Sequence, residues 1–370
     1  MRRTGLRALA GFAAVGLVLA ACGDDDSGGD TDSTGDESGD TPTVGVILPD
    51  SASSARWETA DRGFLEDAFE AAGVEHDIQN AEGETTNFQT IADGMISAGH
   101  DVLLIVNLDS ETGSAVISDA AAVGIPVIDY DRLTLGGGAE YYVSFDNVAV
   151  GTAIGEGLVT CLQADGVTEG EVVLLNGSPT DNNATLFKEG YEAAITGAGY
   201  GIADDQSVPD WDNTQAGTIF EQIFTATGGQ FVGVASANDG LGGAVVSVLE
   251  RNGLAGEIPT TGQDATDEGL QRVLLGTQCV TVYKAIKAEA DAAAALAVAL
   301  ASGDTEAADA LATGAVEDTE SGEDVPSVLL EPQQIFAENV QDVVADGYTT
   351  AENLCTTEEL QAACEEYGVE

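Results

Sequence analysis

Residues 44–48 read Val44-Gly45-Val46-Ile47-Leu48, an apolar and largely β-branched run without a charge. Such a run is typical of a strand that is buried on both faces of a parallel sheet. The next stretch, 56–72, places apolar side chains at helical spacing and ends at Gly73. A buried strand followed by an amphipathic helix is the building unit of α/β folds. We therefore predict an α/β protein.

The same alternation continues in two series. The first series predicts strands at 44–48, 74–79, 102–106, 125–130 and 141–145, and helices at 56–72, 88–98 and 110–123. The second predicts strands at 172–175, 201–208, 231–235, 259–262 and 279–283, and helices at 148–162, 183–197, 213–227, 241–252, 266–275 and 285–301. Two series of this kind predict two lobes of similar build, each with a parallel sheet covered on both faces.

The composition excludes several classes of function. The 370 residues include 65 acidic and 11 basic side chains, for a formal net charge of −54. So few cations exclude a nucleic-acid-binding protein, because neutralising phosphates requires clustered Lys and Arg. They also argue against docking on anionic lipid through a basic patch. A hydrophobic share of 44% indicates a folded domain rather than a disordered acidic tail.

Catalytic motifs are absent from the sequence. The only histidines are His76 and His100, and there is neither a Gly-x-Ser-x-Gly motif nor the Gly-Lys pair of a phosphate-binding loop. We therefore predict no enzyme, no cofactor and no metal site.

The N-terminus predicts export. A basic region, 1–7, precedes an apolar run, 8–21, that is too short for a comfortable membrane span. The run ends in Leu19-Ala20-Ala21-Cys22, which resembles the lipobox of bacterial lipoproteins and implies a signal peptide at 1–21 and lipidation of Cys22. The alternative is an ordinary secretory signal. Residues 22–42 are rich in Asp, Gly and Ser and predict a flexible acidic tether between a membrane anchor and the folded domain.

Four cysteines remain after Cys22, and an even number in an exported protein favours disulfides. Three pairings are open. The preferred one joins Cys355 to Cys364, which are close in sequence, and leaves Cys161 with Cys279.

Polar side chains follow the predicted strands at the edge where parallel sheets bind ligands. Three of the eight cations that remain after signal removal lie there, namely Arg56, Arg132 and Lys284. Both tryptophans, Trp57 and Trp211, lie in such loops as well. An indole face suits the C–H side of a sugar ring, and mixed carboxylates, amides and cations suit its hydroxyls. The alternatives are cations that pair with surface carboxylates and indoles that only pack at the edge of a core.

The sequence also resembles a known family at these positions. The motifs are residues 130–132 (Tyr-Asp-Arg), 144–147 (Ser-Phe-Asp-Asn), 177–184 (Gly-Ser-Pro-Thr-Asp-Asn-Asn-Ala), 186–187 (Leu-Phe), 238–239 (Asn-Asp), 262–264 (Gly-Gln-Asp), 276–278 (Gly-Thr-Gln) and 281–284 (Thr-Val-Tyr-Lys). Their joint order resembles the periplasmic sugar-binding proteins of type I that serve bacterial ABC importers, and among them the D-xylose-binding branch. The resemblance runs from about residue 44 to about residue 346.

The resemblance implies a fold, a site and a mechanism. The fold is two Rossmann-like lobes joined by three hinge strands, with lobe one at 43–146 plus 285–320 and lobe two at 147–284 plus 321–370. The hinge closes on a monosaccharide, most expectedly D-xylose, and the closed monomer presents it to a permease and its ATPase. The implied sugar-binding residues are Arg56, Trp57, Asp131, Arg132, Asp181, Asn183, Trp211, Asn238, Asp264 and Lys284. Residues 49–55 are smaller and more polar than is usual in the family, which leaves the choice of pentose open.

Two other functions stay open at this point. A lipoprotein sensor that presents sugar to a chemoreceptor or a histidine kinase would use the same ligand chemistry. An enzyme acting on sugars would need two carboxylates held apart around a water, whereas here amides and cations accompany the acids. A transcriptional repressor of related lobe fold is excluded by the export signal and by the absence of a basic DNA-binding head.

Overall fold

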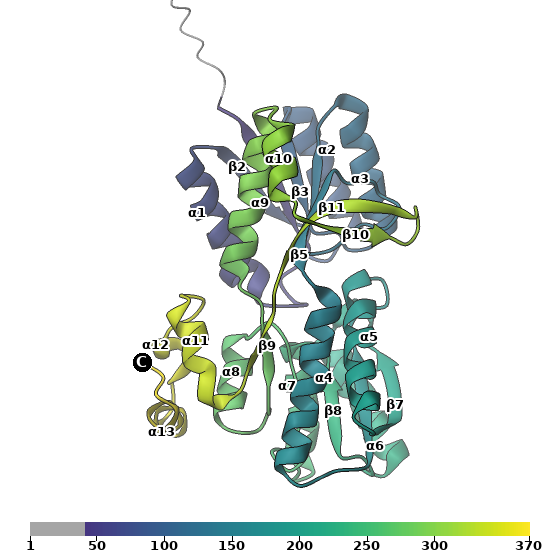
Figure 1. Cartoon of the computed structure of the whole chain (residues 1–370), viewed down its shortest axis with the longest axis vertical. Helices are drawn as coiled ribbons and strands as arrows, with labels where there is room; N and C mark the ends of the chain where they lie inside the picture. Colours follow the sequence, from purple (N-terminus) through teal and green to yellow (C-terminus); the bar gives the residue numbers. More distant parts are fainter. Residues whose placement is uncertain (1–40) are drawn as a thin grey trace, which may run out of the picture. The chain divides into compact units, whose positions relative to one another are not determined.

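The computed structural model describes residues 41–370, which form one compact unit. The predicted signal peptide, Cys22 and nearly all of the predicted tether lie outside the described residues. Within the described part, the chain builds two α/β halves, each around its own sheet (Figure 1). Parallel pairing dominates both sheets, as the apolar strand runs predict.

The first half is built on a seven-stranded sheet in the order β10-β11-β5-β4-β3-β1-β2. Its strands are β1 (Thr43–Leu48), β2 (Glu75–Asn80), β3 (Val102–Ile105), β4 (Val127–Tyr130), β5 (Tyr141–Phe145), β10 (Gly314–Asp318) and β11 (Glu323–Leu330). Successive strand residues face opposite sides, so Val46 packs with α1 (Arg62–Ala72) and α9 (Ile286–Ala301), whereas Ile47 packs with α2 (Thr85–Ala98) and α3 (Ser110–Val123). The sheet is thus covered on both faces.

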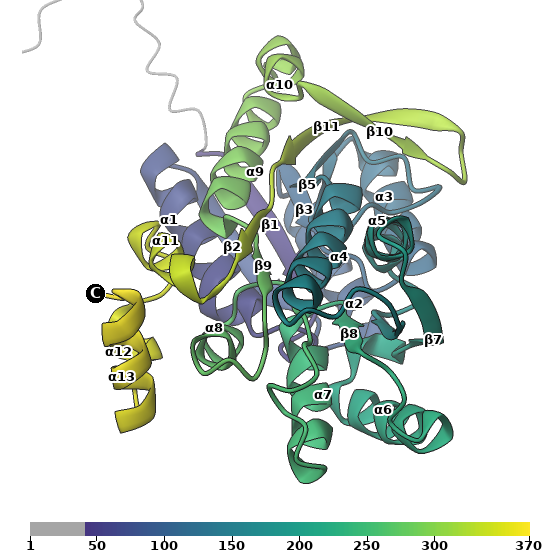
Figure 2. The same ribbon diagram turned by 60° about the horizontal axis from the view of Figure 1, so that its bottom comes forward.

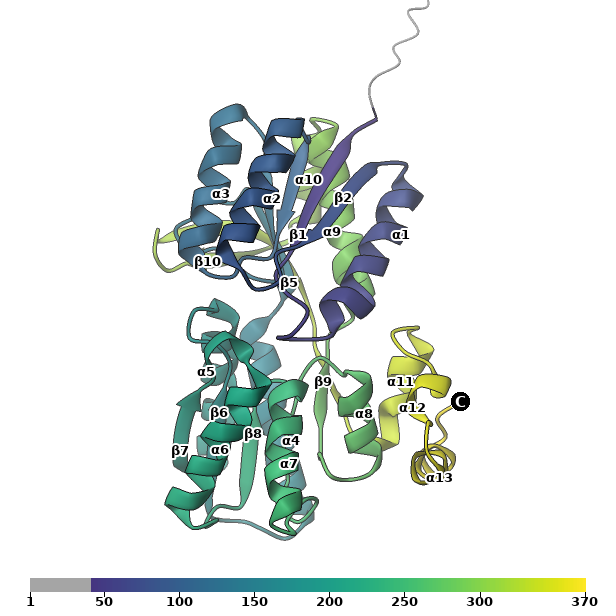
Figure 3. The ribbon, with the colours of Figure 1, turned by 180° about the vertical axis from the view of Figure 1, so that it is seen from behind.

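The second half is built on a three-stranded parallel sheet in the order β7-β6-β8. Its elements are β6 (Glu171–Asn176), β7 (Gly201–Ser207), β8 (Gly233–Ser236), α4 (Asn147–Ala164), α5 (Asn182–Gly197), α6 (Asn213–Thr227) and α7 (Asp239–Arg251). A separate two-stranded sheet pairs β9 (Thr281–Tyr283) with β12 (Gln333–Ile335), beside α8 (Asp267–Leu274). Figure 3 shows β9 and α8 beside this half of the structure.

Two predicted elements differ from those observed. The strand expected at 259–262 is present only as isolated bridges, Val234↔Thr260 and Thr261↔Val280. Its backbone still bonds on both sides: the Thr261 N–H donates to the Val234 carbonyl, and the Gly262 N–H donates to the Val280 carbonyl. The helix expected at 56–72 begins with a π-helical turn, η1 (Trp57–Asp61), in which the Arg62 N–H donates to the Trp57 carbonyl. Apolar spacing does not distinguish a π turn from an α turn, although π turns are frequent at functional sites.

The C-terminal part also differs from expectation. After α10 (Thr305–Leu311), the chain forms the β10–β11 hairpin, and β11 pairs in parallel with β5 as far as Leu330. Residues 321–330 therefore belong to the first half, and the division expected at residue 320 lies ten residues too early. The chain then returns to the second half through β12, so that it crosses between the halves after β5, after β9 and after β11 (Figure 2).

The last elements pack against α8. These are η3 (Ala337–Asn339), α11 (Val340–Ala345), α12 (Ala351–Leu354) and α13 (Glu358–Tyr367). They share a core with Leu270 and Val273 of α8 and with Ala265, the residue after Asp264. Disulfides join Cys355 to Cys364 and Cys161 to Cys279, which is the pairing that the sequence favoured. Within residues 41–370, no helix combines the length and apolar character of a membrane span.

Candidate functional site

The ten residues singled out in the sequence line one narrow gap between the two halves, a cavity of about 30 Å³. They arrive from the carboxyl ends of strands: Arg56 and Trp57 follow β1, Asp131 and Arg132 follow β4, and Lys284 follows β9. Asp181, Trp211 and Asn238 follow β6, β7 and β8 in the other sheet. Ligands of parallel sheets bind at this edge. The structure thus brings all ten side chains together.

Among the cations that line the gap, Arg56 pairs with the largest number of carboxylates. Its guanidinium makes two bonds to Asp61, with Nε–Oδ2 at 2.9 Å and Nη2–Oδ1 at 2.7 Å, and one from Nη1 to Asp131 Oδ2 at 2.9 Å. A third carboxylate, Glu289, lies 3.0 Å from Nη2. Burial lowers the pKa of Arg56, but these carboxylates outweigh it and raise the pKa well above the ordinary value. Arg56 is therefore a permanent cation, and its central carbon lies 4.3 Å from the centre of the Trp57 ring.

Asp131 connects Arg56 to Lys284. Its Oδ2 accepts from Arg56 and lies 3.3 Å from Lys284 Nζ, and Lys284 in turn lies 3.4 Å from Asp264 Oδ1. Burial raises the pKa of Asp131, but Lys284, Arg56 and Arg132 overcome that effect and lower it below its usual range. The carboxyl is therefore ionised and can accept from a ligand hydroxyl. Its backbone is left-handed, with φ of 61°, a strained conformation typical of functional sites.

Asp181 and Trp211 form the wall on the second half. Asp181 caps α5 by accepting from the Asn183 N–H at 2.9 Å, accepts from Trp211 Nε1 at 3.1 Å and pairs with Arg132 Nε at 3.1 Å. Trp211 ends the short helix η2 (Pro209–Trp211) with φ of 54°, which is unusual for a bulky side chain. The Asn183 amide spans the gap and donates to the Asp131 carbonyl at 2.8 Å.

Asn238 and Asp264 complete the site. Asn238 caps α7 through the Leu241 N–H at 2.9 Å, and its amide donates to the Ser53 carbonyl of the first half at 3.2 Å. Asp264 has φ of 97° and accepts from Ser54 Oγ at 2.8 Å. Two oxygens of this loop, Gln263 Oε1 and Asp264 Oδ1, are buried without a hydrogen-bond partner among the described residues. Unsatisfied buried acceptors are costly, so these oxygens favour a ligand that donates.

A buried carboxylate, Asp239, holds the strained 262–266 loop in place. It accepts from the Thr266 N–H at 2.9 Å, from Gln278 Nε2 at 2.7 Å and from Thr281 Oγ1 at 2.8 Å. Burial raises the pKa of Asp239 to about 6, although Arg272 and these side-chain hydrogen bonds oppose the effect. Its role is to support Asp264 rather than to face the gap.

Sequence reasoning did not single out four other residues that line the gap: Ser53, Ser54, Phe187 and Gln263. Phe187 was quoted only as part of a motif, and Gln263 only as the neighbour of Asp264. Ser53 and Ser54 lie in the small polar loop after β1, where composition gave no signal beyond a departure from the family pattern. Asp61 and Glu289, which pair with Arg56 on the side away from the gap, were also missed. In a sequence with 65 acidic residues, nothing distinguishes a buried acid in a helix from an exposed one.

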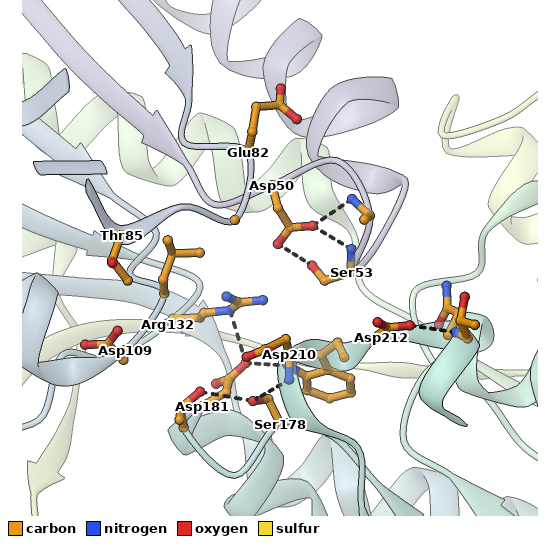
Figure 4. Close-up of a pocket in the computed structure, with 17 residues that line it drawn as sticks. Asp50, Ser53, Glu82, Thr85, Asp109, Arg132, Ser178, Asp181, Asp210 and Asp212 are labelled. Atoms are coloured by element: carbon orange, nitrogen blue, oxygen red, sulfur yellow. Dashed lines mark hydrogen bonds and ion pairs between the residues drawn. The ribbon is translucent and has the colours of Figure 1, made fainter. Parts of the chain in front are cut away.

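A larger cavity of about 530 Å³ lies beside the gap and shares Ser53, Arg132, Asp181 and Trp211 with it. Figure 4 shows the Arg132–Asp181 ion pair in this cavity, with Asp50 and Glu82 on one side and Ser178 and Asp210 on the other. The Asp50 carboxylate already accepts hydrogen bonds from the Ser53 N–H and the Ser53 hydroxyl. The cavity is therefore lined largely by polar side chains and adjoins the gap at the ion pair.

The charges of the gap offset one another. Arg56, Arg132 and Lys284 each lie within 3.4 Å of at least one carboxylate oxygen. A site in which every cation already has an anion does not favour an anionic ligand, whereas paired carboxylates, amides and ammonium groups can both accept from and donate to hydroxyls. The two indoles add flat apolar faces. This chemistry fits an uncharged polyhydroxylated ring. Among residues 41–370, no cluster of three or more His, Cys, Asp or Glu is placed to hold a metal ion.

Comparisons with known proteins agree with this chemistry. The profile of the periplasmic binding protein domain matches residues 44–305. The D-xylose-binding periplasmic protein of Escherichia coli (strain K12) is 34% identical over 298 residues, which are 79% of this chain and 87% of that protein. The protein of the same name from Haemophilus influenzae is 33% identical, over 81% of this chain and 88% of its own. The crystal structure of a carbohydrate transporter solute-binding protein from Chloroflexus aurantiacus, in complex with D-glucose, superposes with a TM-score of 0.74 at 26% identity, covering 85% of this chain and 98% of that one.

Proposed function

Because this chain belongs to the family of periplasmic binding protein domains, and its relatives bind sugars, we propose that it is the extracytoplasmic receptor of an ABC sugar importer and that its ligand is D-xylose. The observation that carries the proposal is the gap itself. Ten polar and aromatic side chains from both halves meet there, and two buried oxygens, Gln263 Oε1 and Asp264 Oδ1, accept no hydrogen bond among the described residues. The second of them lies 3.4 Å from Lys284 Nζ. A neutral sugar supplies the hydroxyl donors that those oxygens lack.

The sugar enters and is held by movement of the two halves. A cavity of about 30 Å³ accommodates only one or two water molecules. The halves also bond to each other directly, through Ser54 to Asp264 and through Asn183 to the Asp131 carbonyl. A sugar ring therefore enters an open form, replaces these cross-gap bonds with its own, and is enclosed when the hinge closes. The closed form is the one presented to the permease.

The indoles and the paired charges have distinct roles in this mechanism. Trp57 and Trp211 hold the apolar faces of the ring, while Asp131, Asp264 and Lys284 bind its hydroxyls. Hydrogen bonds to charged groups contribute about 1.5–3 kcal/mol each, which corresponds to about tenfold or more in affinity. The proposal assigns the protein binding without catalysis, as expected of a receptor for a transporter.

Calorimetric titration of residues 41–370 with a monosaccharide panel tests the proposal. D-Xylose is expected to bind with a Kd of about 1 μM or less, with other pentoses and D-glucose weaker. Trp57→Ala and Asp264→Ala are each expected to weaken binding about tenfold or more, with unchanged circular dichroism. The control Asp291→Asn removes a carboxylate from an exposed pair with Lys287. Failure of every monosaccharide to bind, or full affinity in both variants, would refute the assignment.

The proposal includes a lipid anchor at Cys22. The sequence before it has the lipobox pattern, and the acidic stretch that follows keeps the folded part away from the membrane. Mass spectrometry of the protein purified from membranes is expected to show a diacylated N-terminal Cys22. Cys22→Ser is expected to release the protein from the membrane fraction, and retention of this variant there would exclude the anchor.

A further inference from the structure

Glu289 is a carboxylate of the described chain that is completely shielded from solvent and lies behind the gap. It stands in the first turn of α9, which begins two residues after Lys284, where the chain crosses from the second half to the first. Its Oε2 lies 3.0 Å from Arg56 Nη2, and its Oε1 has no hydrogen-bond partner among the described residues. A buried carboxylate is costly unless it is paired. Its place in the fold is therefore tied to Arg56.

Three directions fix the Arg56 guanidinium. Asp61, the last residue of η1 and five residues after Arg56, binds Nε and Nη2. Asp131, from the loop after β4, binds Nη1. Glu289 approaches Nη2 from α9, a third element. A planar guanidinium bound on three sides has one orientation available. Asp61 has a second partner, because it also accepts from the Tyr130 hydroxyl of β4 at 2.8 Å. Glu289 has Arg56 as its only cation within salt-bridge distance in the described part of the chain.

The orientation of Arg56 matters because of what lies on its other side. The guanidinium is stacked over the Trp57 ring, 4.3 Å from its centre, and both residues line the gap. If the guanidinium rotates so that Nη2 moves away from Glu289, it also moves off the face of the Trp57 ring. We propose that Glu289 is a positioning residue of the sugar site, which acts through Arg56 to set the indole and guanidinium surface that the ligand meets. The proposal rests on the proposed sugar-binding function.

The surroundings of Glu289 make the effect dependent on pH. Six titratable or charged groups face Glu289. They are Arg56, which precedes η1; Asp61, which ends η1; Tyr130, which ends β4; Asp131, which follows β4; Tyr142 of β5; and Lys284, which precedes α9. Burial raises the pKa of Glu289 well above its ordinary value, and Asp131 and Asp61 raise it further, against Arg56 and Lys284. When the carboxyl is protonated, the attraction of Glu289 for Arg56 loses its ionic part, but an oxygen that accepts from Nη2 remains. Protonation should therefore lower the sugar affinity by no more than the small loss expected for Glu289→Gln.

Three variants of residues 41–370, the compact unit, test the proposal. Glu289→Leu removes the acceptor, Glu289→Gln keeps an oxygen for Arg56 Nη2 but does not titrate, and Asp291→Asn is the control on the exposed face of the same helix. We expect D-xylose to bind Glu289→Leu about tenfold more weakly and Glu289→Gln within about threefold of the wild type. The affinity of Glu289→Gln should vary less with pH than that of the wild type, because the amide does not titrate. Asp291→Asn should retain both the affinity and the pH dependence of the wild type.

A second readout does not need a ligand. In the Trp211→Phe background Trp57 is the sole tryptophan, so its emission reports whether the guanidinium still covers it. Glu289→Leu should shift that emission and Glu289→Gln should not. Full sugar affinity in Glu289→Leu, or lost affinity with unchanged Trp57 emission, would overturn the positioning role. If the wild type binds no monosaccharide, the proposed function fails, and an unchanged emission in Glu289→Leu would then refute the Arg56 contact separately.

Discussion

The Trp211 ring lies directly against the backbone of Gly177: a β-carbon on residue 177 would come within 2.0 Å of the ring's Cη2 atom. Gly177 follows β6, and Trp211 follows β7, so the contact joins the ends of two neighbouring strands. The indole reaches the gap only because residue 177 has no side chain. Its Nε1 then donates to Asp181 Oδ2 at 3.1 Å, which fixes the plane of the ring.

Gly177→Ala is therefore expected to displace Trp211 and weaken D-xylose binding about tenfold or more, with little change in the far-ultraviolet circular dichroism. The methyl group has no room, because the atoms that it meets belong to a rigid ring rather than to the end of a flexible chain. Calorimetry and tryptophan emission measure the two effects. Gly217→Ala, on α6 with nothing within 4 Å of the added carbon, is the matched control. Equal affinity in both variants would contradict the role given to Trp211.

Lys284 is expected to be essential for stability as well as for binding. Its ammonium lies between Asp131 Oδ2 at 3.3 Å and Asp264 Oδ1 at 3.4 Å, and all three side chains are buried. Lys284→Met leaves the Asp264 carboxylate without a cation, and breaking a buried ion pair costs about 3–5 kcal/mol. Urea unfolding should show that loss. Adding Asp264→Asn should restore part of the stability but not the sugar binding, whereas no recovery in the double variant would place the cost elsewhere.

The sequence was sufficient to group the candidate residues, because polar residues that can bind ligands follow the strand ends of an α/β fold. Apolar β-branched runs mark buried strands, and the polar residues that follow them must lie at one edge of the sheet. In a chain with so few cations, three of them at such ends stand out. Arg56, Arg132 and Lys284 do line one gap, together with both indoles.

What the sequence could not reveal depends on backbone conformation and on contacts between the halves. Asp131, Trp211 and Asp264 all have positive φ, which no local pattern encodes for these residue types. Ser54 enters the site only because the halves meet and its hydroxyl reaches Asp264. The β10–β11 hairpin was missed because it joins the first sheet some 170 residues after β5, a pairing that no short-range periodicity predicts.

The two disulfides are expected to contribute very differently to stability. Cys161 on α4 and Cys279 before β9 are 118 residues apart, whereas Cys355 and Cys364 are separated by nine. Closing a long loop restricts the unfolded chain more than closing a short one. Cys161→Ser/Cys279→Ser should lower the free energy of unfolding by about 2–5 kcal/mol, and Cys355→Ser/Cys364→Ser by less. Neither pair lines the gap, so D-xylose affinity should be kept in both variants; a loss confined to the second pair would show that the segment after α12 supports Asp264.

Asp129 is expected to make the folded state less stable as the pH rises. It lies in β4, fully buried, and accepts from the Thr134 N–H at 2.6 Å and the Thr134 hydroxyl at 2.7 Å. Burial raises its pKa to about 7, against these two bonds, while Asp318 and Glu140 raise it further. The folded state therefore holds a proton that the unfolded chain has already lost above its ordinary pKa of about 3.8.

The stabilisation of the folded state that comes from the raised Asp129 pKa is therefore fully present below about pH 4. It is lost progressively as the pH rises from there to about 7. Asp129→Asn is neutral at every pH and keeps an oxygen for Thr134, so its unfolding free energy should fall less steeply over this window than that of the wild type. Urea unfolding at several pH values from 4.5 to 7.5 gives the slope of unfolding free energy against pH for each protein. The difference between the two slopes isolates Asp129, because the general charge repulsion of an acidic chain affects both proteins alike. Parallel slopes would mean that Asp129 ionises in the fold as readily as it does in the unfolded chain, and that the two Thr134 bonds fully offset its burial.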